Sequence, residues 1–397
     1  MLPDSVRGLV TQIKRTLLRS PIGDGYRELH GRINAHRFLA LLDRHLKAGR
    51  PVYSEEFVRS RLVARSAERR RLDGEPPTVA AFGGSGWLQY GFWPAFAKLT
   101  RFHLSAYGEE HAPPVAGESG AEMRQRRERG FLKFVDEIGA VDVAFFYASG
   151  EHLSSALFAE LHRRGIWTVV MGLDDQHQFL GPRDADDVPH QQRIACLCDV
   201  YWTTWKLGAQ IVLNWGGTPW LAPEGADPEF HRCEPRERDI DVLFVGLRSR
   251  HRASLVEFLG RRGFRVSTFG EGWPAGSVDF ETAVGLFNRA KIVLGVGETG
   301  GMPGVRCLKG RDFEVSMCGA AYLTSYQPEL ADCFRIGEEI ACYSSLEECA
   351  QLIHYYLEHP DKAEKLRQAA RARCLADHTW QRRVGALLGL MGGAGRR

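Results

Sequence analysis

The densest group of residues that could do chemistry lies between Lys309 and Glu314. Lys309 and Arg311 stand at the mouth of a short helical pattern, and Glu314 follows within its first turn or so. A helix amino terminus exposes unpaired N–H groups and carries partial positive charge, so two cations there would help to bind a diphosphate. A carboxylate at Glu314 can accept hydrogen bonds from two vicinal hydroxyl groups, as on a ribose. The spacing gives equal weight to a structural alternative, in which Glu314 complements the helix dipole and Arg311 pairs with a surface carboxylate.

Two adjacent carboxylates, Asp174 and Asp175, follow a buried apolar run at residues 167–171 and precede His177. Such a group could hold a divalent metal together with phosphate oxygens. The pair lacks the separated aspartate–x–aspartate spacing, and the two cations at the helix mouth already supply positive charge. The sequence therefore favours a site without metal. The structural alternative is that one of the two aspartates caps the next helix.

The same part of the chain offers candidates for acid–base chemistry, in the order Asp175, His152 and Asp174. His152 follows the apolar run 141–147, so all three come at the carboxyl ends of predicted strands, where parallel sheets bind ligands. A positioned carboxylate or imidazole could take the proton from an attacking hydroxyl group. For His152, a polar pair with Glu151 at the start of a helix is the structural alternative.

Two turns containing glycine also follow predicted strands. Gly83, Gly84 and Ser85 come after the first strand, where their N–H groups could approach a ligand, and a simple tight turn fits equally well. Gly246 and Arg248 end the first strand of the second half, a position from which an arginine can reach a phosphate. An ordinary surface arginine is the alternative for Arg248.

These residues are positioned by two series of apolar runs that alternate with amphipathic helical stretches. The runs of the first series are 78–82, 102–107, 141–147, 167–171 and 200–204. Those of the second series are 241–246, 265–269, 291–296, 320–324 and 340–343. Apolar strands separated by helices indicate βαβ units and parallel sheets covered on both faces. We therefore predict two doubly wound, Rossmann-like α/β domains that face each other across a cleft.

The segments between the runs predict the helices and the linker. Helical patterns cover 87–99, 122–138, 153–164, 189–197, 250–262, 282–289, 312–318, 346–357 and 362–376. Capping-box spacing marks two helix starts, at Ser345 with Glu348 and at Asp361 with Glu364. Residues 223–238, rich in Pro, Gly and charge, are predicted to link the two domains.

The first 75 residues are predicted to form a helical extension. Apolar residues recur at helical spacing from Val6 to Leu18, with Arg and Lys between them. Such a basic amphipathic stretch can lie on an anionic membrane surface, but we favour packing on the protein, because this pattern is normal for soluble helices. A second basic run, 59–71, is predicted to be a solvated helix face.

The composition excludes several classes of protein. Lys plus Arg (52) and Asp plus Glu (49) nearly balance, which excludes a histone-like polycation or an acidic tail protein. The basic runs hold few aromatic residues, so nucleic-acid binding is not expected. Nine cysteines without a C-x-x-C pair indicate a reduced chain with neither a disulfide framework nor a structural zinc site. With no signal peptide and no apolar run of about 18 residues, we expect a cytoplasmic protein whose membrane contact, if any, is peripheral at the inner face.

A set of short segments in the second half forms a familiar pattern. It comprises Lys309–Glu314, Cys318–Gly319, Tyr322–Thr324, Pro328–Leu330, Gly337–Ile340, Tyr355–Pro360, and His378–Trp380 with Arg383. Related segments lie upstream, at 242–246, 269–273, Asp174–Asp175 and Gly225–Pro228. Together they resemble the CgeB-like, group 1 glycosyltransferases of GT-B fold, over about residues 78–390.

The resemblance implies transfer of a sugar from a nucleotide-sugar donor to an acceptor, which could be a glycan, a lipid-linked molecule or a small molecule. The second domain would hold the donor, with Glu314 at the ribose and two cations near the diphosphate. The implied donor-binding residues are Lys309, Arg311, Glu314, Arg248, Gly246 and Gly319. No cofactor is expected, since the nucleotide sugar is a substrate. Many group 1 enzymes carry a first glutamate eight residues before the second; Arg306 stands there in this chain, so retention and inversion both stay open.

The predicted domain boundaries follow from these patterns. They are 1–75 for the helical extension, 76–225 for the acceptor domain, 239–378 for the donor domain, and 379–397 for a last helix and tail, with a return of that helix to the first domain as one option. Two other functions remain open on the same fold. A nucleotide-sugar epimerase or hydrolase needs no acceptor, and a non-catalytic sugar-nucleotide-binding protein would neither transfer nor hydrolyse the donor.

Overall fold

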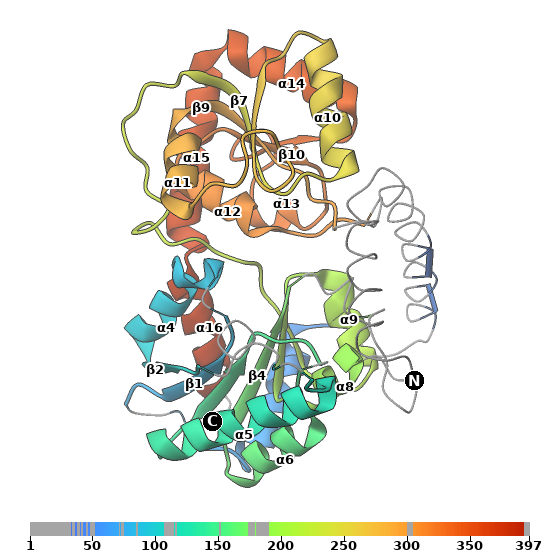
Figure 1. The fold of residues 1–397 in the computed structure, drawn as a ribbon, viewed down its shortest axis with the longest axis vertical. Coiled ribbons are helices and arrows are strands. Elements are labelled where there is room, and N and C mark those ends of the chain that lie inside the picture. Colours follow the sequence, from blue (N-terminus) through green and yellow to red (C-terminus); the bar gives the residue numbers. More distant parts are fainter. Residues whose placement is uncertain are drawn as a thin grey trace.

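The structure is a computed structural model. It describes residues 52–392 except 71, 73–74, 85, 107–114, 116, 151, 174–178, 180–189 and 300–304, together with positions 33, 36, 37, 40, 43, 44 and 47. Two α/β domains lie one above the other along the long axis of the molecule (Figure 1). The predicted pair of parallel, doubly wound sheets is confirmed. The predicted amphipathic segment from Val6 to Leu18 lies outside the described residues.

The first domain is built on a six-stranded parallel sheet with the order β2-β1-β3-β4-β5-β6. Its strands are β1 (Thr78–Phe82), β2 (Arg101–Leu104), β3 (Val143–Phe146), β4 (Trp167–Gly172), β5 (Val200–Thr203) and β6 (Pro219–Leu221). Its helices are α3 (Glu55–Ser66), η1 (Trp87–Gln89), α4 (Phe92–Leu99), α5 (Gly120–Ile138), α6 (Ser155–Arg163), α8 (His190–Leu197) and α9 (Lys206–Asn214). Every residue of β1, β3, β4 and β5 is buried, which explains why these strands read as continuous apolar runs.

The second domain has a five-stranded parallel sheet with the order β11-β10-β9-β7-β8. Its strands are β7 (Ile240–Val245), β8 (Val266–Phe269), β9 (Ala290–Leu294), β10 (Tyr322–Ser325) and β11 (Ala341–Tyr343). Its helices are α10 (Arg250–Arg261), α11 (Phe280–Arg289), α12 (Gly310–Met317), α13 (Leu330–Cys333), α14 (Leu346–Glu358) and α15 (Pro360–Asp377). Separate apolar clusters cover the two faces of the sheet.

One predicted helix start is wrong. Ser345 does cap α14, with its hydroxyl accepting the Glu348 N–H. Asp361, in contrast, does not cap α15. That helix begins at Pro360, and His359 is the residue before it. Proline is well suited to this position because its fixed φ is helical and its missing N–H would have no partner there.

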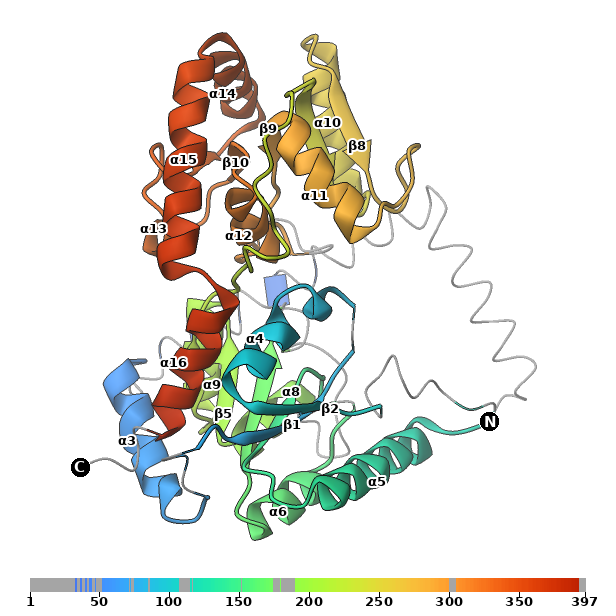
Figure 2. The same ribbon diagram turned by 90° about the vertical axis from the view of Figure 1, so that its left-hand side faces the viewer.

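The chain crosses between the domains twice, and the two crossings are paired. After α15, the chain enters α16 (Trp380–Gly392), which packs against α4 and α3 of the first domain (Figure 2). The linker runs beside this crossing: Ala226 N–H donates to the His378 carbonyl (3.0 Å), and Trp380 N–H donates to the Ala226 carbonyl (3.1 Å). A side chain at Gly225 would stand 3.0 Å from the His378 oxygen, so glycine permits this close approach.

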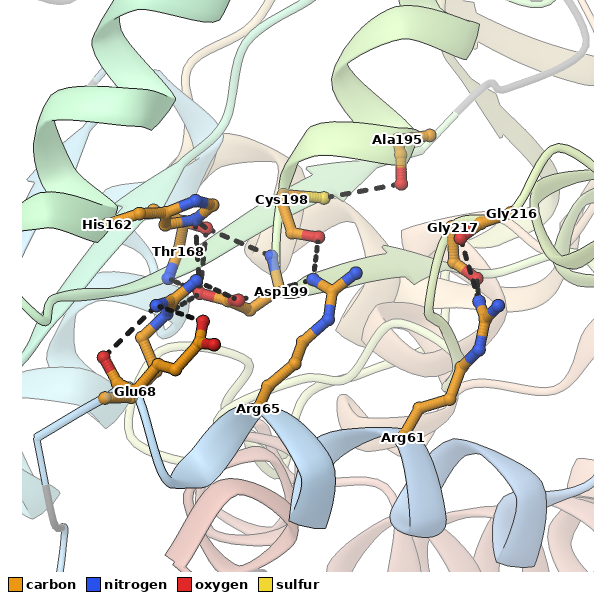
Figure 3. A network of polar contacts seen from close by, with 11 residues as sticks. Arg61, Arg65, Glu68, His162, Thr168, Ala195, Cys198, Asp199, Gly216 and Gly217 are labelled. Atoms are coloured by element: carbon orange, nitrogen blue, oxygen red, sulfur yellow. Dashed lines mark hydrogen bonds and ion pairs between the residues drawn. The ribbon is translucent and has the colours of Figure 1, made fainter.

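The basic run 59–71 is not a solvated helix face, which corrects the prediction. Arg61 and Arg65 are four residues apart on α3, so they share one face of the helix, and Figure 3 shows that face turned onto the protein; Arg69 follows just after the helix ends. Arg61 Nη1 donates to the Gly216 carbonyl (2.8 Å), and Arg65 Nη1 donates to that of Cys198 (2.8 Å). Arg69 makes two bonds to the buried Asp199 carboxylate, at 2.9 and 3.0 Å. These contacts fix α3 to the first domain.

Among the described residues, no helix combines the length and the apolar character needed to cross a bilayer.

Candidate functional site

The loops that follow the strands of the first domain contact those of the second. Tyr90, in the loop after β1, stacks on Phe280 at the start of α11, with ring centroids 3.8 Å apart and planes 3° from parallel. Lys206 opens α9 after β5, and its Nζ lies 2.6 Å from Asp332 Oδ2 in α13, which follows β10. The carboxyl ends of the two sheets therefore face each other, which is where doubly wound folds bind ligands.

Helix α12 begins at this shared edge. Lys309 is the residue before the helix, and its N–H donates to the Asp312 carboxylate (2.9 Å). Burial raises the pKa of Asp312 to about 7, an effect that the hydrogen bond from Lys309 N–H only partly offsets. Lys309 and Arg311 are half-buried at the mouth of the helix, whose N–H groups and dipole favour an anion.

Arg311 reaches across the carboxyl end of β7. A methyl group at Gly246 would stand 3.0 Å from Arg311 Nη1 and 3.5 Å from Arg252 Nη1, so these guanidinium groups gather over the strand end. Arg248 is exposed next to them, with its guanidinium 5.7 Å from the centre of the Trp273 ring. The structure thus brings Arg311 to Gly246, and it places Arg248 two residues after Gly246, beside Trp273.

These two arginines lack the usual partners. Within the part of the chain that the structure describes, neither Arg248 nor Arg311 forms an ion pair, and no side-chain hydrogen bond joins Arg311 to another residue. A cation without a carboxylate partner, at a helix amino terminus, is available to an anionic ligand.

Glu314 lies on the same helix, near the interdomain linker. Its side chain is 24% exposed, and Oε1 is 3.9 Å from Nε2 of His231, a linker residue whose side chain is only 3% exposed. A side chain at Gly310 would stand 2.9 Å from Glu224 Oε2 and 3.1 Å from Glu314 Oε1. Two carboxylates and an imidazole therefore converge beside the first turn of α12.

Gly319 is not part of this group. It lies past the other end of α12, and a helix of eight residues is about 12 Å long. Its φ of +67° closes the helix, a side chain there would stand 2.7 Å from Cys233 Sγ, and its carbonyl accepts from Arg238 Nη2 (3.0 Å). The glycine is explained by this turn and not by a ligand.

The candidates in the first domain are placed in part. Trp93 Nε1 donates to the Gly84 carbonyl (2.9 Å), and a side chain at Gly83 would stand 3.0 Å from the Trp93 ring. These two glycines therefore make room for Trp93. His152 lies in the loop after β3, with Nδ1 2.9 Å from Ser149 Oγ. Ser85, Asp174 and Asp175 lie outside the described residues.

Sequence reasoning missed the contribution of the linker. Asp227 fixes it to the first domain, with Oδ2 3.7 Å from Lys98 Nζ, which also binds Glu229 at 2.6 Å. His231 and Glu224 look like ordinary polar residues of a charged linker in the sequence. Their only signal is their place between the two domains, where both carboxyl edges meet. Among the described residues, no three His, Cys, Asp or Glu side chains group in a way that could hold a metal.

Comparisons with known proteins agree with this architecture. Residues 248–389 match a family model described as glycosyl transferase-like. Sucrose-phosphate synthase from Thermosynechococcus elongatus has a similar structure (TM-score 0.57, 14% identity, covering 81% of this chain and 100% of that one). So does Alr3699/HepE from Anabaena in complex with UDP-glucose (TM-score 0.55, 11% identity, 78% and 98% covered). A third is AviGT4, a glycosyltransferase involved in avilamycin A biosynthesis (TM-score 0.52, 17% identity, 80% and 99% covered).

No curated protein sequence matches the chain. The structural neighbours establish the fold, and the family model covers most of the second domain, where Lys309, Arg311 and Glu314 lie. The chain therefore has the GT-B fold, and residues 248–389 of it are similar to the glycosyl transferase-like family.

Proposed function

We propose that the chain transfers a sugar from a nucleotide-sugar donor to a hydroxyl group of an acceptor. The observation that carries this proposal is the position of Arg311. Its guanidinium lies over the end of β7 at the mouth of α12, without an ion pair to any described residue, on the edge that faces the other domain. A cation held there fits the diphosphate of a donor that is shared between two domains.

The other residues of the group fit the remaining parts of such a donor. In this proposal, Lys309 and the first N–H groups of α12 bind phosphate oxygens, and the Glu314 carboxylate accepts from two ribose hydroxyl groups; their position at and beside the start of α12 supports these roles. One structural neighbour, HepE, is described with UDP and with UDP-glucose, which makes uridine nucleotides the first ligands to test.

We propose that no metal takes part in donor binding. Two cations and a helix amino terminus together offset much of the negative charge of a diphosphate, which is the task that a divalent cation would otherwise perform. Transfer should therefore survive an excess of EDTA. Loss of activity in EDTA that magnesium or manganese restores would refute this and favour Asp174 and Asp175 as metal ligands.

We assign the acid–base step to the first domain, with Asp175 ahead of His152 and Asp174. If the reaction inverts the anomeric centre, the acceptor hydroxyl needs a positioned base, which typically contributes 10²- to 10⁴-fold. Asp175→Asn keeps size and hydrogen bonding but removes basicity. We expect at least a tenfold lower turnover with unchanged donor affinity. A folded variant with wild-type turnover would exclude Asp175 and shift the assignment to His152.

The function itself is tested by a panel of UDP, ADP, GDP and dTDP in thermal unfolding, followed by incubation with the matching nucleotide sugars. A ligand at 100 times its Kd adds about 2.7 kcal/mol of stability. We expect one diphosphate to stabilise the protein and its sugar conjugate to release that diphosphate slowly by hydrolysis, and faster with an acceptor. No stabilisation by any member would refute the proposal. Conversion of the sugar without release of nucleotide would indicate an epimerase, and binding without turnover a binding protein.

A further inference from the structure

His231 is buried in the linker with one ring nitrogen bound and the other without a partner among the described residues. Nδ1 lies 3.2 Å from both the N–H and the carbonyl oxygen of Asp227, but that carbonyl already accepts from the backbone N–H groups of Phe230 (3.1 Å) and His231 (2.7 Å). Nδ1 is therefore best used as the acceptor, which puts the proton on Nε2. Nε2 is buried and has no hydrogen-bond partner in the part of the chain that the structure describes, and such groups are rare in folded proteins.

The unpartnered nitrogen is aimed at Glu314. The distance from Nε2 to Glu314 Oε1 is 3.9 Å, about 1 Å longer than a hydrogen bond. The imidazole packs perpendicular to the Phe280 ring, with centroids 5.2 Å apart and planes at 84°, which helps to hold the imidazole in place. Glu314 is the mobile member of the pair, since its carboxylate is partly exposed on a flexible side chain.

A second carboxylate, that of Glu224, lies near Glu314. Gly310 has no side chain, and Glu224 Oε2 and Glu314 Oε1 lie 2.9 and 3.1 Å from the position that a Cβ there would take. Two neighbouring carboxylates repel each other, which favours movement of Glu314 away from Glu224 and toward a donor N–H. His231 Nε2 is such a donor within reach.

We propose that His231 is the positioning residue for Glu314: its Nε2–H donates to Oε1 when the donor ribose is bound, and leaves Oε2 to accept from the ribose hydroxyl groups. This rests on the proposed function, in which Glu314 holds the ribose. A carboxylate that is fixed in advance loses less side-chain entropy on binding, so His231 adds affinity without touching the ligand.

Two substitutions separate the two ring nitrogens. His231→Asn places an amide oxygen near the position of Nδ1 and removes Nε2, whereas His231→Gln places an amide N–H near the position of Nε2. By calorimetry with UDP, we expect His231→Asn to bind about tenfold more weakly and His231→Gln to stay within about threefold of wild type. In a Glu314→Ala background, His231→Asn should cause no further loss. Equal losses in both single variants, or a further tenfold loss in the Glu314→Ala background, would overturn the proposal.

A matched control is the exposed pair of His354 and Glu358 on α14, whose Nε2 and Oε2 are 3.3 Å apart. His354→Asn should leave UDP affinity unchanged. A measurement without nucleotide keeps the two proposals distinguishable: in protein with ¹⁵N-labelled histidine, Glu314→Gln should move the His231 Nε2 signal while the His378 signals stay. If wild type binds no nucleotide, the proposed function fails whatever the spectrum shows. If wild type binds UDP and Glu314→Gln moves no His231 signal, only the role of His231 fails. If His231→Asn does not fold, the histidine spectrum of Glu314→Gln still tests the role of His231.

Discussion

Two groups of arginines in this molecule carry the same charge and have opposite environments. Arg61, Arg65 and Arg69 bind backbone carbonyls and the buried Asp199 carboxylate at the outer end of the first domain. Arg248 and Arg311 lie where the two domains meet, and no described carboxylate pairs with them. The first group is saturated by the protein itself, so it stabilises the fold. The second retains its capacity to bind an anion.

Two buried carboxylates, those of Asp199 and Asp312, also have contrasting environments. Burial alone would raise the pKa of Asp199, but hydrogen bonds from His162 and Arg69 outweigh it and hold the pKa below its usual range. Among the described residues, Asp312 has no such ion pair, and burial raises its pKa to about 7. Asp199 therefore favours the folded state except in acid, whereas the contribution of Asp312 is lost as pH rises from about 4 to about 7.

The largest effect is expected at Asp199. Asp199→Ala leaves Arg69 buried without its carboxylate, and breaking a buried pair in this way costs about 3–5 kcal/mol. Urea denaturation should show this loss of unfolding free energy, while UDP affinity of the folded protein stays the same. A loss below about 1 kcal/mol would mean that the network in Figure 3 does not hold α3 in place.

The pH dependence of stability gives the next largest effect. Each tenfold change in proton affinity is worth about 1.4 kcal/mol, so wild type should lose roughly 2–4 kcal/mol between pH 4 and pH 7.5 through Asp312. Asp312→Asn keeps an acceptor for the Lys309 N–H but does not titrate, so its unfolding free energy should fall less over this range. Parallel pH profiles for the two proteins would contradict the raised pKa.

Arg311 tests the other side of the comparison. Arg311→Ala should weaken UDP binding about ten- to a hundredfold and uridine binding little, because the lost partner is a phosphate, with stability within about 0.5 kcal/mol. Glu314→Ala should weaken both ligands alike. Arg61→Ala is the matched control and should show the reverse pattern, with about 1 kcal/mol lower stability and unchanged UDP affinity. Calorimetry with UDP and uridine decides, and equal losses for both ligands in Arg311→Ala would remove it from the phosphate site.

The smallest effect is expected at an arginine whose pairing is close but exposed. Arg163 Nη2 lies 2.6 Å from Glu160 Oε1 on the surface of α6. Solvent screens such pairs, so Arg163→Ala should change neither the denaturation midpoint nor UDP affinity measurably. A loss comparable to that of Asp199→Ala would show that short distance alone predicts stability here.

Much of the fold could be predicted from the sequence, because many strands are marked by the composition of one short segment. The runs at Thr78–Phe82 and Trp167–Gly172 are buried on both faces, so apolar composition marks them within a residue or so. Two elements of the first domain were missed. β6 is a three-residue edge strand that begins with proline. α9 is buried on most of its surface, so it shows no polar face to reveal its period.

The candidate site likewise has a part that could be predicted from the sequence and a part that could not. Lys309, Arg311 and Glu314 lie within one segment, so their grouping at a helix start can be predicted. The contact between His231 and Glu314 joins residues far apart in sequence, and so does the pairing of Arg69 with Asp199, 130 residues away. Pattern alone cannot distinguish a saturated arginine from an unpaired one, because the partner is supplied by the fold.

Because α16 returns to the first domain, that domain can be completed only after the second domain has been synthesised. Trp380, Val384 and Leu387 complete the apolar cluster that covers Phe92 and Phe96 of α4. A ribosome that has finished α4 must add the whole second domain before it reaches those residues, which takes on the order of tens of seconds. The second domain is therefore complete first, at a time when α16 does not yet cover α4 and the sheet face around it. Chaperone demand during synthesis should concentrate on the first domain, and a chain that lacks α16 loses part of the apolar cluster on one face of that domain's sheet.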